Sequence, residues 1–128
     1  MIKFRAWDNE NETYLYDVQK AYDMFGGTVK YVDGADANYE ECCFGDFLSN
    51  RRYDVEQFTG LTDETGKDIY EGDILENRKY RSIVKFASGK FLADLIETIQ
   101  TFDLIGETHG SKVIGNVHEN PELLEADK

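Results

Sequence analysis

The chain has 128 residues with 26 acidic and 14 basic side chains, which gives a formal net charge of −12. Its hydrophobic fraction of 41% and its 8 Phe, 8 Tyr and 1 Trp exclude a disordered chain, and its length suits one domain with a core of its own. Phosphate backbones and anionic membrane faces repel a surface this acidic, and no segment reaches the roughly 20 apolar residues of a membrane span. We therefore expect a cytosolic protein that makes no membrane contact and for which nucleic acid is an unfavoured partner.

The first 50 residues are expected to begin with a β-hairpin. Residues 2–7 and 13–18 alternate apolar and polar side chains around a polar turn, which is the pattern of half-buried strands. A short strand is predicted within residues 26–34, between glycine turns. Residues 36–50 could hold a helical turn but are expected to be irregular, because Gly45 would interrupt a longer helix.

The central stretch TGLTDETGKDIYEGDIL, residues 59–75, reads as short strands joined by tight turns. A strand over residues 53–58 leads into it, and Gly66 and Gly72 can take the positive φ that sharp reversals require. Residues 82–95 predict a further hairpin. Short strands separated by glycine turns predict a small, strongly bent sheet or barrel, so the fold class is mainly β, with α+β as the alternative.

The last third contains one ambiguous segment. Residues 92–102 combine the spacing of a helix face with β-branched residues typical of strands, and a short helix is predicted there. Residues 112–117 predict a strand with a bulge or bend at Gly115. Asn120 and Pro121 then mark the start of a short C-terminal helix.

Acidic residues crowd the central stretch and allow two interpretations. Asp68, Glu71, Asp73 and Glu76 would hold magnesium or act in acid–base catalysis if they converged on one pocket. The predicted strand and bend scatter them instead: Asp68 and Glu71 solvate an exposed strand edge, and Asp73 supports the bend at Gly72. We therefore expect no enzyme, no catalytic residues, no cofactor and no metal.

Cysteine and histidine give no sign of a nucleophile–base pair. Cys42 and Cys43 are adjacent, which suits neither an ordinary disulfide nor a zinc site, and both are expected to be reduced thiols. His109 is expected in a loop, and His118 at the end of a strand. Neither histidine lies near a cysteine in the sequence.

The candidate contact surface is a basic cluster within RKYRSIVKF, and it comprises Arg78, Lys79, Arg81 and Lys85. On a strand, Arg81 and Lys85 share one face, and small bent barrels use such a strand to hold a ligand or a peptide. Nearby acids offset the cluster, so cross-strand pairing with Asp68 or Glu76 is the simpler interpretation.

Three ordered stretches carry a family resemblance: IKFRAWD near the start, QFTGLTDETGKDIYEGDIL in the centre and VIGNVHENPELL near the end. Together they resemble the YopX family of phage and prophage proteins. Residues 20–50 and 92–110 fit the pattern loosely or not at all, and His118 stands where tyrosine is expected.

The resemblance implies one YopX-like domain over residues 1–128, with an N-terminal subregion of about 1–50 and a barrel-like subregion of about 54–120. It also implies a mainly β fold with a small SH3-like barrel. The family has no agreed activity, so it supplies no catalytic residues to transfer to this chain.

Three hypotheses follow for function. The first is a non-enzymatic phage or prophage accessory protein that binds a host or phage protein, with a homo-oligomer left open. The second is a nucleic-acid-linked role, either as an acidic decoy or as a barrel that contacts strands through the basic cluster. The third is a carboxylate-dependent magnesium hydrolase that uses Asp68, Glu71 or Asp73.

Overall fold

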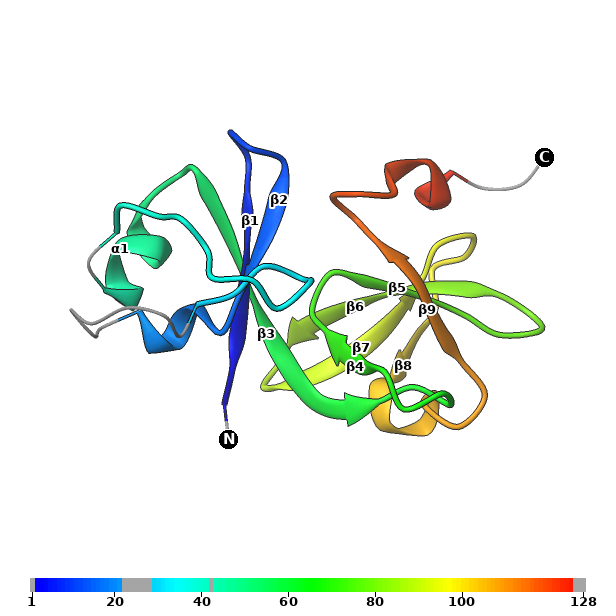
Figure 1. The fold of residues 1–128 in the computed structure, drawn as a ribbon. Helices are drawn as coiled ribbons and strands as arrows, with labels where there is room; N and C mark the ends of the chain where they lie inside the picture. Colours follow the sequence, from blue (N-terminus) through cyan, green and yellow to red (C-terminus); the bar gives the residue numbers. More distant parts are fainter. Residues whose placement is uncertain (1, 22–28, 42, 126–128) are drawn as a thin grey trace. The chain divides into compact units, whose positions relative to one another are not determined.

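The structure is a computed structural model that describes residues 2–21, 29–41 and 43–125. It is mainly β, with 42% strand and 14% helix, which confirms the predicted fold class. The chain divides into two compact units, residues 1–57 and 58–128, which are described separately below (Figure 1). The single family domain over residues 1–128 stays a prediction.

Unit 1 is built on an antiparallel sheet in the order β2-β1-β3. Its strands are β1 (Phe4–Asp8), β2 (Thr13–Tyr16) and the first half of β3 (Tyr53–Thr62), so the predicted N-terminal hairpin is confirmed. A 3-10 helix η1 (Val18–Lys20) follows the hairpin, and a short helix α1 (Phe44–Ser49) precedes β3.

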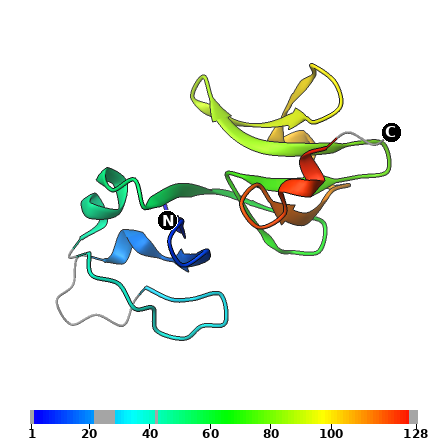
Figure 2. The same ribbon diagram turned by 90° about the horizontal axis from the view of Figure 1, so that it is seen from above.

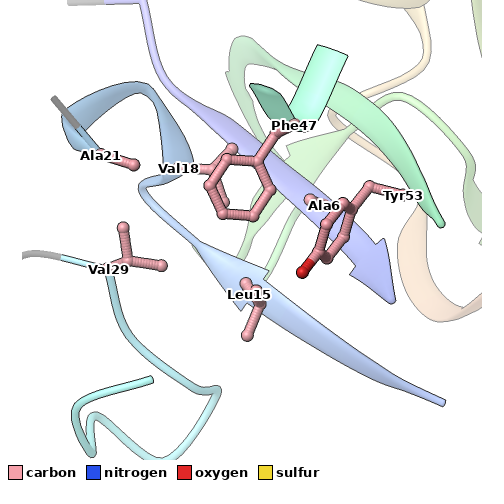
Figure 3. Close-up of a cluster of buried hydrophobic side chains, with 7 residues drawn as sticks. All are labelled: Ala6, Leu15, Val18, Ala21, Val29, Phe47 and Tyr53. Carbon is pink, nitrogen blue, oxygen red and sulfur yellow. The ribbon is translucent and has the colours of Figure 1, made fainter. Parts of the chain in front are cut away.

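One face of this sheet carries the core of unit 1. Figure 3 shows the buried cluster, which consists of Ala6, Leu15, Val18, Ala21, Val29, Phe47 and Tyr53. Phe47 of α1 is fully buried, and its ring centroid lies 4.7 Å from that of Tyr53 and 5.6 Å from that of Tyr39. Phe44 of α1 also contacts Phe4 of β1, with ring centroids 4.9 Å apart, so two aromatic side chains pack the short helix against the sheet.

The opposite face of β1 is buried too, which corrects the prediction of a half-buried strand. Arg5 is 4% exposed, and its Nε donates to Oε1 of Glu56 at 2.8 Å. The hydroxyl of Tyr14 donates to the same oxygen at 3.0 Å, and the Arg5 guanidinium lies 4.3 Å from the centre of the Tyr14 ring. The burial of Arg5 is possible because the Glu56 carboxylate neutralises its charge and the Tyr14 ring packs against its guanidinium.

Two predictions for the segment before β3 were wrong. Instead of a strand over residues 26–34, the described part of that segment makes isolated bridges at Lys30, to Tyr16 and to Asp36. Residues 44–49 form a short helix, the alternative that the sequence allowed, rather than an irregular segment. Gly45 is only the second residue of α1, so it interrupts no turn of the helix.

Unit 2 contains the rest of β3 and a five-stranded antiparallel sheet in the order β8-β7-β6-β5-β9. Its elements are β4 (Asp68–Tyr70), β5 (Asp73–Glu76), β6 (Arg81–Ala87), β7 (Lys90–Leu95), β8 (Thr101–Asp103), η2 (Leu104–Gly106), β9 (Lys112–Asn116) and η3 (Pro121–Leu124). The sheet is curled like half a barrel around a core of Ile69, Leu75, Val84, Ala93 and Leu104. The strong bend is therefore confirmed, while the SH3-like detail stays a prediction.

The predicted turns of unit 2 are confirmed. Gly66 and Gly72 have φ of 90° and 89°, and the β6–β7 hairpin turns at Ser88 and Gly89 with φ of 54° and 81°. The register of β9 shifts beside Gly115, as expected for a bulge. Glycine adopts such φ values without steric penalty, so Gly66, Gly72 and Gly89 fix where the sheet reverses.

The predicted helix over residues 92–102 is wrong, because β7 and β8 occupy that segment. Ala93 lies directly opposite Val84 of β6 and is fully buried, so strand pairing outweighs the helical spacing. The short C-terminal helix is present as the 3-10 helix η3. The Asn120 side chain does not cap it, and instead accepts a hydrogen bond from the backbone N–H of Asn116 at 3.2 Å.

Candidate functional site

The central stretch also contains Asp63, an acid that was not among the four candidate carboxylates. It is 6% exposed, and its Oδ1 accepts hydrogen bonds from the N–H of Thr65 at 2.8 Å, from the Thr65 hydroxyl at 2.6 Å and from the N–H of Lys67 at 3.0 Å. Its Oδ2 accepts from the N–H of Val113 in β9 at 2.9 Å. The Asp63 side chain therefore stabilises the β3–β4 turn and links it by a hydrogen bond to Val113 of β9, which is 50 residues later in the sequence.

The same contacts set the ionisation of Asp63. Burial on its own would raise the pKa, but the Thr65 hydroxyl and the N–H groups of Val113, Lys67 and Thr65 lower the pKa of Asp63 to about 2. The carboxylate is thus held ionised by donors that also shape the backbone. It is poorly suited to give or take a proton near neutral pH.

Asp73 has a similar role at the next reversal. Its Oδ2 accepts a hydrogen bond from the N–H of Tyr70 at 2.8 Å across the turn at Gly72, which confirms the prediction that it supports this bend. Gly72 also donates to the carbonyl of Val84 at 2.8 Å and accepts from the N–H of Val117 at 3.0 Å. The bend is thereby joined to β6 and to the segment after β9.

The structure does not gather the four proposed carboxylates into a cation site. Asp73 is buried against the Tyr70 backbone, whereas Asp68, Glu71 and Glu76 are half-buried on different elements. Across residues 2–21, 29–41 and 43–125, no three His, Cys, Asp or Glu side chains are grouped so as to hold a metal ion.

Asp8 in unit 1 repeats the pattern of a buried turn-forming carboxylate. It accepts from the N–H groups of Glu10 and Asn11 at 2.9 and 3.3 Å, and Arg52 contacts both of its oxygens at 2.9 Å. Burial would raise the pKa of Asp8, but the Arg52 hydrogen bond and the two N–H groups keep this pKa below its usual value. The N-terminal and the central stretches that carry the family resemblance therefore both contain polar side chains that shape a turn.

The C-terminal stretch uses asparagine for the same purpose. The Asn116 Oδ1 accepts from the N–H groups of His118 and Glu119 at 3.1 and 2.8 Å, and its Nδ2 donates to the Glu119 carboxylate at 2.8 Å. The N–H of Asn120 donates to the Asn116 carbonyl at 3.0 Å. His118 therefore lies in a fixed turn after β9, while His109 lies in the exposed loop before it.

The predicted basic cluster is divided between a turn and a strand. Arg78 and Lys79 are exposed in the β5–β6 turn, whereas Arg81 and Lys85 lie on one face of β6. Arg81 pairs with Glu76 at 2.9 Å, as expected from cross-strand pairing, and Lys85 pairs with Asp94 of β7 at 3.0 Å. The charges of both strand residues are thus compensated locally.

The other face of β6, β7 and β8 carries a group of two exposed and two half-buried aromatic rings that the sequence analysis missed. It comprises Tyr80, Phe86, Phe91 and Phe102, called the aromatic surface below. The rings of Phe86 and Phe91 meet edge to face with centroids 4.9 Å apart, and those of Tyr80 and Phe102 lie 5.8 Å apart. Phe86 is 49% exposed and Phe102 is 38% exposed. The sequence analysis missed this group because it predicted a helix over residues 92–102. Phe91 and Phe102 share one face of the sheet only when β7 and β8 are paired strands.

The aromatic surface continues the inner face of the sheet beyond its core. Phe86 lies opposite Phe91, Val84 opposite Ala93, and Ala93 opposite Phe102, so these side chains project to the same side. Val84 and Ala93 are buried in the core, but the rings beside them reach solvent. Figure 2 shows β6 to β8, coloured yellow-green to orange, along one side of unit 2.

The curled sheet and its polar turn-forming motifs define a small β protein whose motif residues are architectural. The family model described as YopX protein matches residues 3–125, and the chain belongs to this family. A search of curated protein sequences found no match to the chain.

Two solved structures share this fold. Protein EF1440 from Enterococcus faecalis is 29% identical, with a TM-score of 0.63 over 98% of this chain and 99% of that one. Protein yopX from Bacillus subtilis is 21% identical, with a TM-score of 0.51 over 98% of each chain. None of the helices in the described part of the chain has both the length and the apolar character needed to span a bilayer.

Proposed function

We propose that this protein is a non-enzymatic binding module that recognises another protein through the aromatic surface. The observation that carries the proposal is the exposure of Phe86 and Phe102 beside a buried core. Aromatic side chains that reach solvent as a group are typical of protein-binding sites, where they supply much of the binding free energy.

The polar residues in the three stretches that carry the family resemblance support this proposal because they weaken the two alternative functions. Asp8, Asp63 and Asp73 each accept backbone hydrogen bonds that shape a turn, which leaves them unsuited to acid–base catalysis or to magnesium. Arg81 and Lys85 each contact a carboxylate, which weakens their attraction for a phosphate backbone. Both alternatives, hydrolysis and nucleic-acid contact, are therefore less well supported than protein binding.

The setting that we propose is the cytosol of a bacterium, where the protein acts as an accessory protein of a phage or prophage on a host or phage protein. The resemblance to the YopX family supports this setting. The net charge of −12 is consistent with this setting, because a high net charge favours solubility.

The proposal is tested by affinity capture from a bacterial lysate with the wild type, Phe86→Ser and Val32→Ser. Val32 is 81% exposed in unit 1, so Val32→Ser is a matched apolar-to-polar change outside the aromatic surface. We expect the same proteins with the wild type and Val32→Ser, and their loss with Phe86→Ser. Equal capture by all three variants would refute the proposal.

A further inference from the structure

One end of the aromatic surface carries a carboxylate. Tyr80 and Phe102 form this end, with ring centroids 5.8 Å apart and ring planes inclined by 31°. The Tyr80 hydroxyl donates a hydrogen bond to Oε1 of Glu107, the residue that follows η2. This hydrogen bond and partial burial raise the pKa of Tyr80 above its usual value, so the phenol stays neutral. Tyr80 and Glu107 are half-buried and Phe102 is exposed, so a charged acceptor lies beside two rings that solvent reaches.

The charged side chains of β6, β7 and β8 lie on the opposite face of the sheet and are compensated there. Side chains alternate between the two faces along a strand, so the sheet itself separates the rings from these charges. The charged residues are Arg81, Lys85, Lys90, Asp94 and Asp103, and each of them makes an ion pair. The face that carries the rings has no charged side chain from these three strands, all of whose residues the structure describes. Glu107 therefore brings a negative charge to an otherwise uncharged face.

The cations closest to this site in the sequence do not neutralise Glu107. Arg78 and Lys79 precede Tyr80 in the β5–β6 turn, where both are exposed. The Asn77 Oδ1 holds this turn by accepting from the N–H of Lys79 at 2.8 Å and from that of Tyr80 at 3.0 Å. Among the described residues, the Glu107 side chain contacts a neutral phenol but makes no ion pair, so its charge is open to a cation from another molecule.

Unit 1 contains the same pair of groups together with an arginine. The Tyr14 hydroxyl donates to Oε1 of Glu56 at 3.0 Å, and Arg5 donates to the same oxygen at 2.8 Å. The Arg5 guanidinium lies 4.3 Å from the centre of the Tyr14 ring, and the ring of Trp7 packs beside that ring with centroids 5.0 Å apart. One arginine thus binds a tyrosine ring and the carboxylate to which that tyrosine donates.

The Tyr80–Glu107 pair of unit 2 repeats this arrangement without an arginine. Phe102 packs beside Tyr80 as Trp7 packs beside Tyr14, and the carboxylate accepts from the phenol in the same way. No arginine of the described residues makes a ring contact with Tyr80 or an ion pair with Glu107. The pair in unit 2 is half-buried rather than buried, so a side chain of another molecule can reach it.

We propose that Tyr80, Phe102 and Glu107 bind an arginine side chain of the partner protein, whose guanidinium lies over the Tyr80 ring and donates to the Glu107 carboxylate. This inference rests on the proposed function and names one residue that the partner presents. A guanidinium is planar, always charged and rich in donors, so it can stack on a ring and pair with a carboxylate at once. The backbone already fixes both groups, because Asn77 holds the turn before Tyr80 and the N–H of Glu107 donates to the carbonyl of buried Leu104 at 2.8 Å. Binding therefore requires little ordering of the site.

The probe is a short peptide with one arginine among serines, titrated into the full chain. One control peptide has citrulline in place of arginine, which keeps the planar shape and removes the charge, and a second has lysine. We expect the arginine peptide to bind about tenfold more tightly than the citrulline peptide and about threefold more tightly than the lysine peptide. Equal affinities for arginine and citrulline, equal affinities for arginine and lysine, or no binding of the arginine peptide would each overturn the proposal.

Two variants with the same change in net charge locate the effect. Glu107→Gln removes the charge but keeps an acceptor for the Tyr80 hydroxyl, so the site keeps its shape. Glu97→Gln changes an exposed acid in the turn between β7 and β8. We expect Glu107→Gln to weaken binding of the arginine peptide about fivefold to tenfold, and Glu97→Gln to weaken it less than about twofold. Equal weakening by the two variants would mean general charge attraction and would overturn the proposal.

Nuclear magnetic resonance of the wild type gives an answer that does not depend on how a variant folds. The arginine peptide should cause its largest side-chain shifts at Tyr80, Phe102 and Glu107, because the guanidinium contacts these groups. Shifts spread evenly over the acidic residues of the chain would overturn the proposal. If Phe86→Ser abolishes protein capture while Glu107→Gln captures as much as Glu97→Gln, the inference fails and the proposed function stands. If capture is independent of Phe86, the proposed function itself fails.

Discussion

The two sides of the curled sheet in unit 2 are built differently. On the β5–β9 side, the Asp63 carboxylate joins the β3–β4 turn to β9, and the Asn116 and Asn120 side chains fix the chain after β9. On the β7–β8 side, the edge strand is exposed, and its ion pair joins two side chains, Lys90 and Asp103, that are each 58% exposed.

This difference separates residues that specify the fold from residues that are available for binding. The β5–β9 side comes from the stretches that carry the family resemblance, and its polar groups are used in turns. The β7–β8 side comes from the segment that fits the family pattern loosely. Because exposed aromatic rings contribute little to the core, we expect binding specificity to reside there.

The largest expected effect is that of Asp63→Asn. The amide places an NH2 against backbone donors and leaves buried N–H groups without an acceptor, so the free energy of unfolding should fall by about 2–4 kcal/mol. Chemical denaturation measures this. Glu64→Gln is the control, since the Glu64 side chain contacts Lys112 at 3.8 Å and the backbone hydrogen bond from Glu64 to Ser111 is kept, so stability should change by less than about 0.5 kcal/mol. Equal losses for the two variants would contradict the role of Asp63.

The same residue predicts a pH dependence. The pKa of Asp63 is lowered to about 2 in the folded protein from 3.8, so its contribution is complete above about pH 4 and is lost as pH falls towards 2. That contribution amounts to about 2 kcal/mol. The stability difference between the wild type and Asp63→Asn should therefore shrink by about this amount between pH 6 and pH 2. A constant difference would show that Asp63 does not act through its charge.

A smaller effect is expected at Gly115. A Cβ added there would lie 2.4 Å from the Asn120 Oδ1 and 3.0 Å from the Asn120 Cβ, so Gly115→Ala should destabilise the protein by about 1–3 kcal/mol. Asn120→Gly removes the obstructing atoms. In that background the same alanine should reduce stability by less than about 0.5 kcal/mol, which a double-mutant cycle measures. If Gly115→Ala destabilises the protein equally in both backgrounds, the contact with Asn120 is not the cause of the destabilisation.

The smallest effect is expected on the outer face of β6 and β7. Lys85 and Asp94 are separated by 3.0 Å, and their side chains are 54% and 35% exposed. A double-mutant cycle with alanine at both positions should give a coupling of about 0.2–1 kcal/mol that weakens in high salt. A coupling well above this range would mean that polar side-chain contacts stabilise the β7–β8 side as strongly as the β5–β9 side, which contradicts the comparison.

Local chemistry made the turns and most strands predictable from the sequence. Glycine takes positive φ without steric penalty, so the sharp turns at Gly66 and Gly72 could be predicted directly from the sequence. The support that Asp73 gives to its bend followed from the same reasoning. The contact between Asp63 and Val113 could not be predicted, because it depends on the arrangement of strands 50 residues apart.

The errors have physical causes as well. Residues 92–102 have helical spacing, yet pairing of Ala93 with Val84 makes them strands. Arg5 was expected on an exposed face, but its partners Glu56 and Tyr14 come from other strands. The aromatic surface was missed for the same reason, since Phe102 joins the other rings only after β8 pairs with β7.

The most direct test measures protein capture and stability together for Phe86→Ser and Asp63→Asn. Capture from a bacterial lysate is quantified per folded molecule, with the folded fraction taken from denaturation of the same samples. The account predicts that Phe86→Ser loses capture while remaining nearly as stable as the wild type, and that Asp63→Asn loses stability while its folded molecules capture normally. If folded Asp63→Asn fails to capture and Phe86→Ser captures as the wild type does, the assignment of folding and binding to these two sides is wrong.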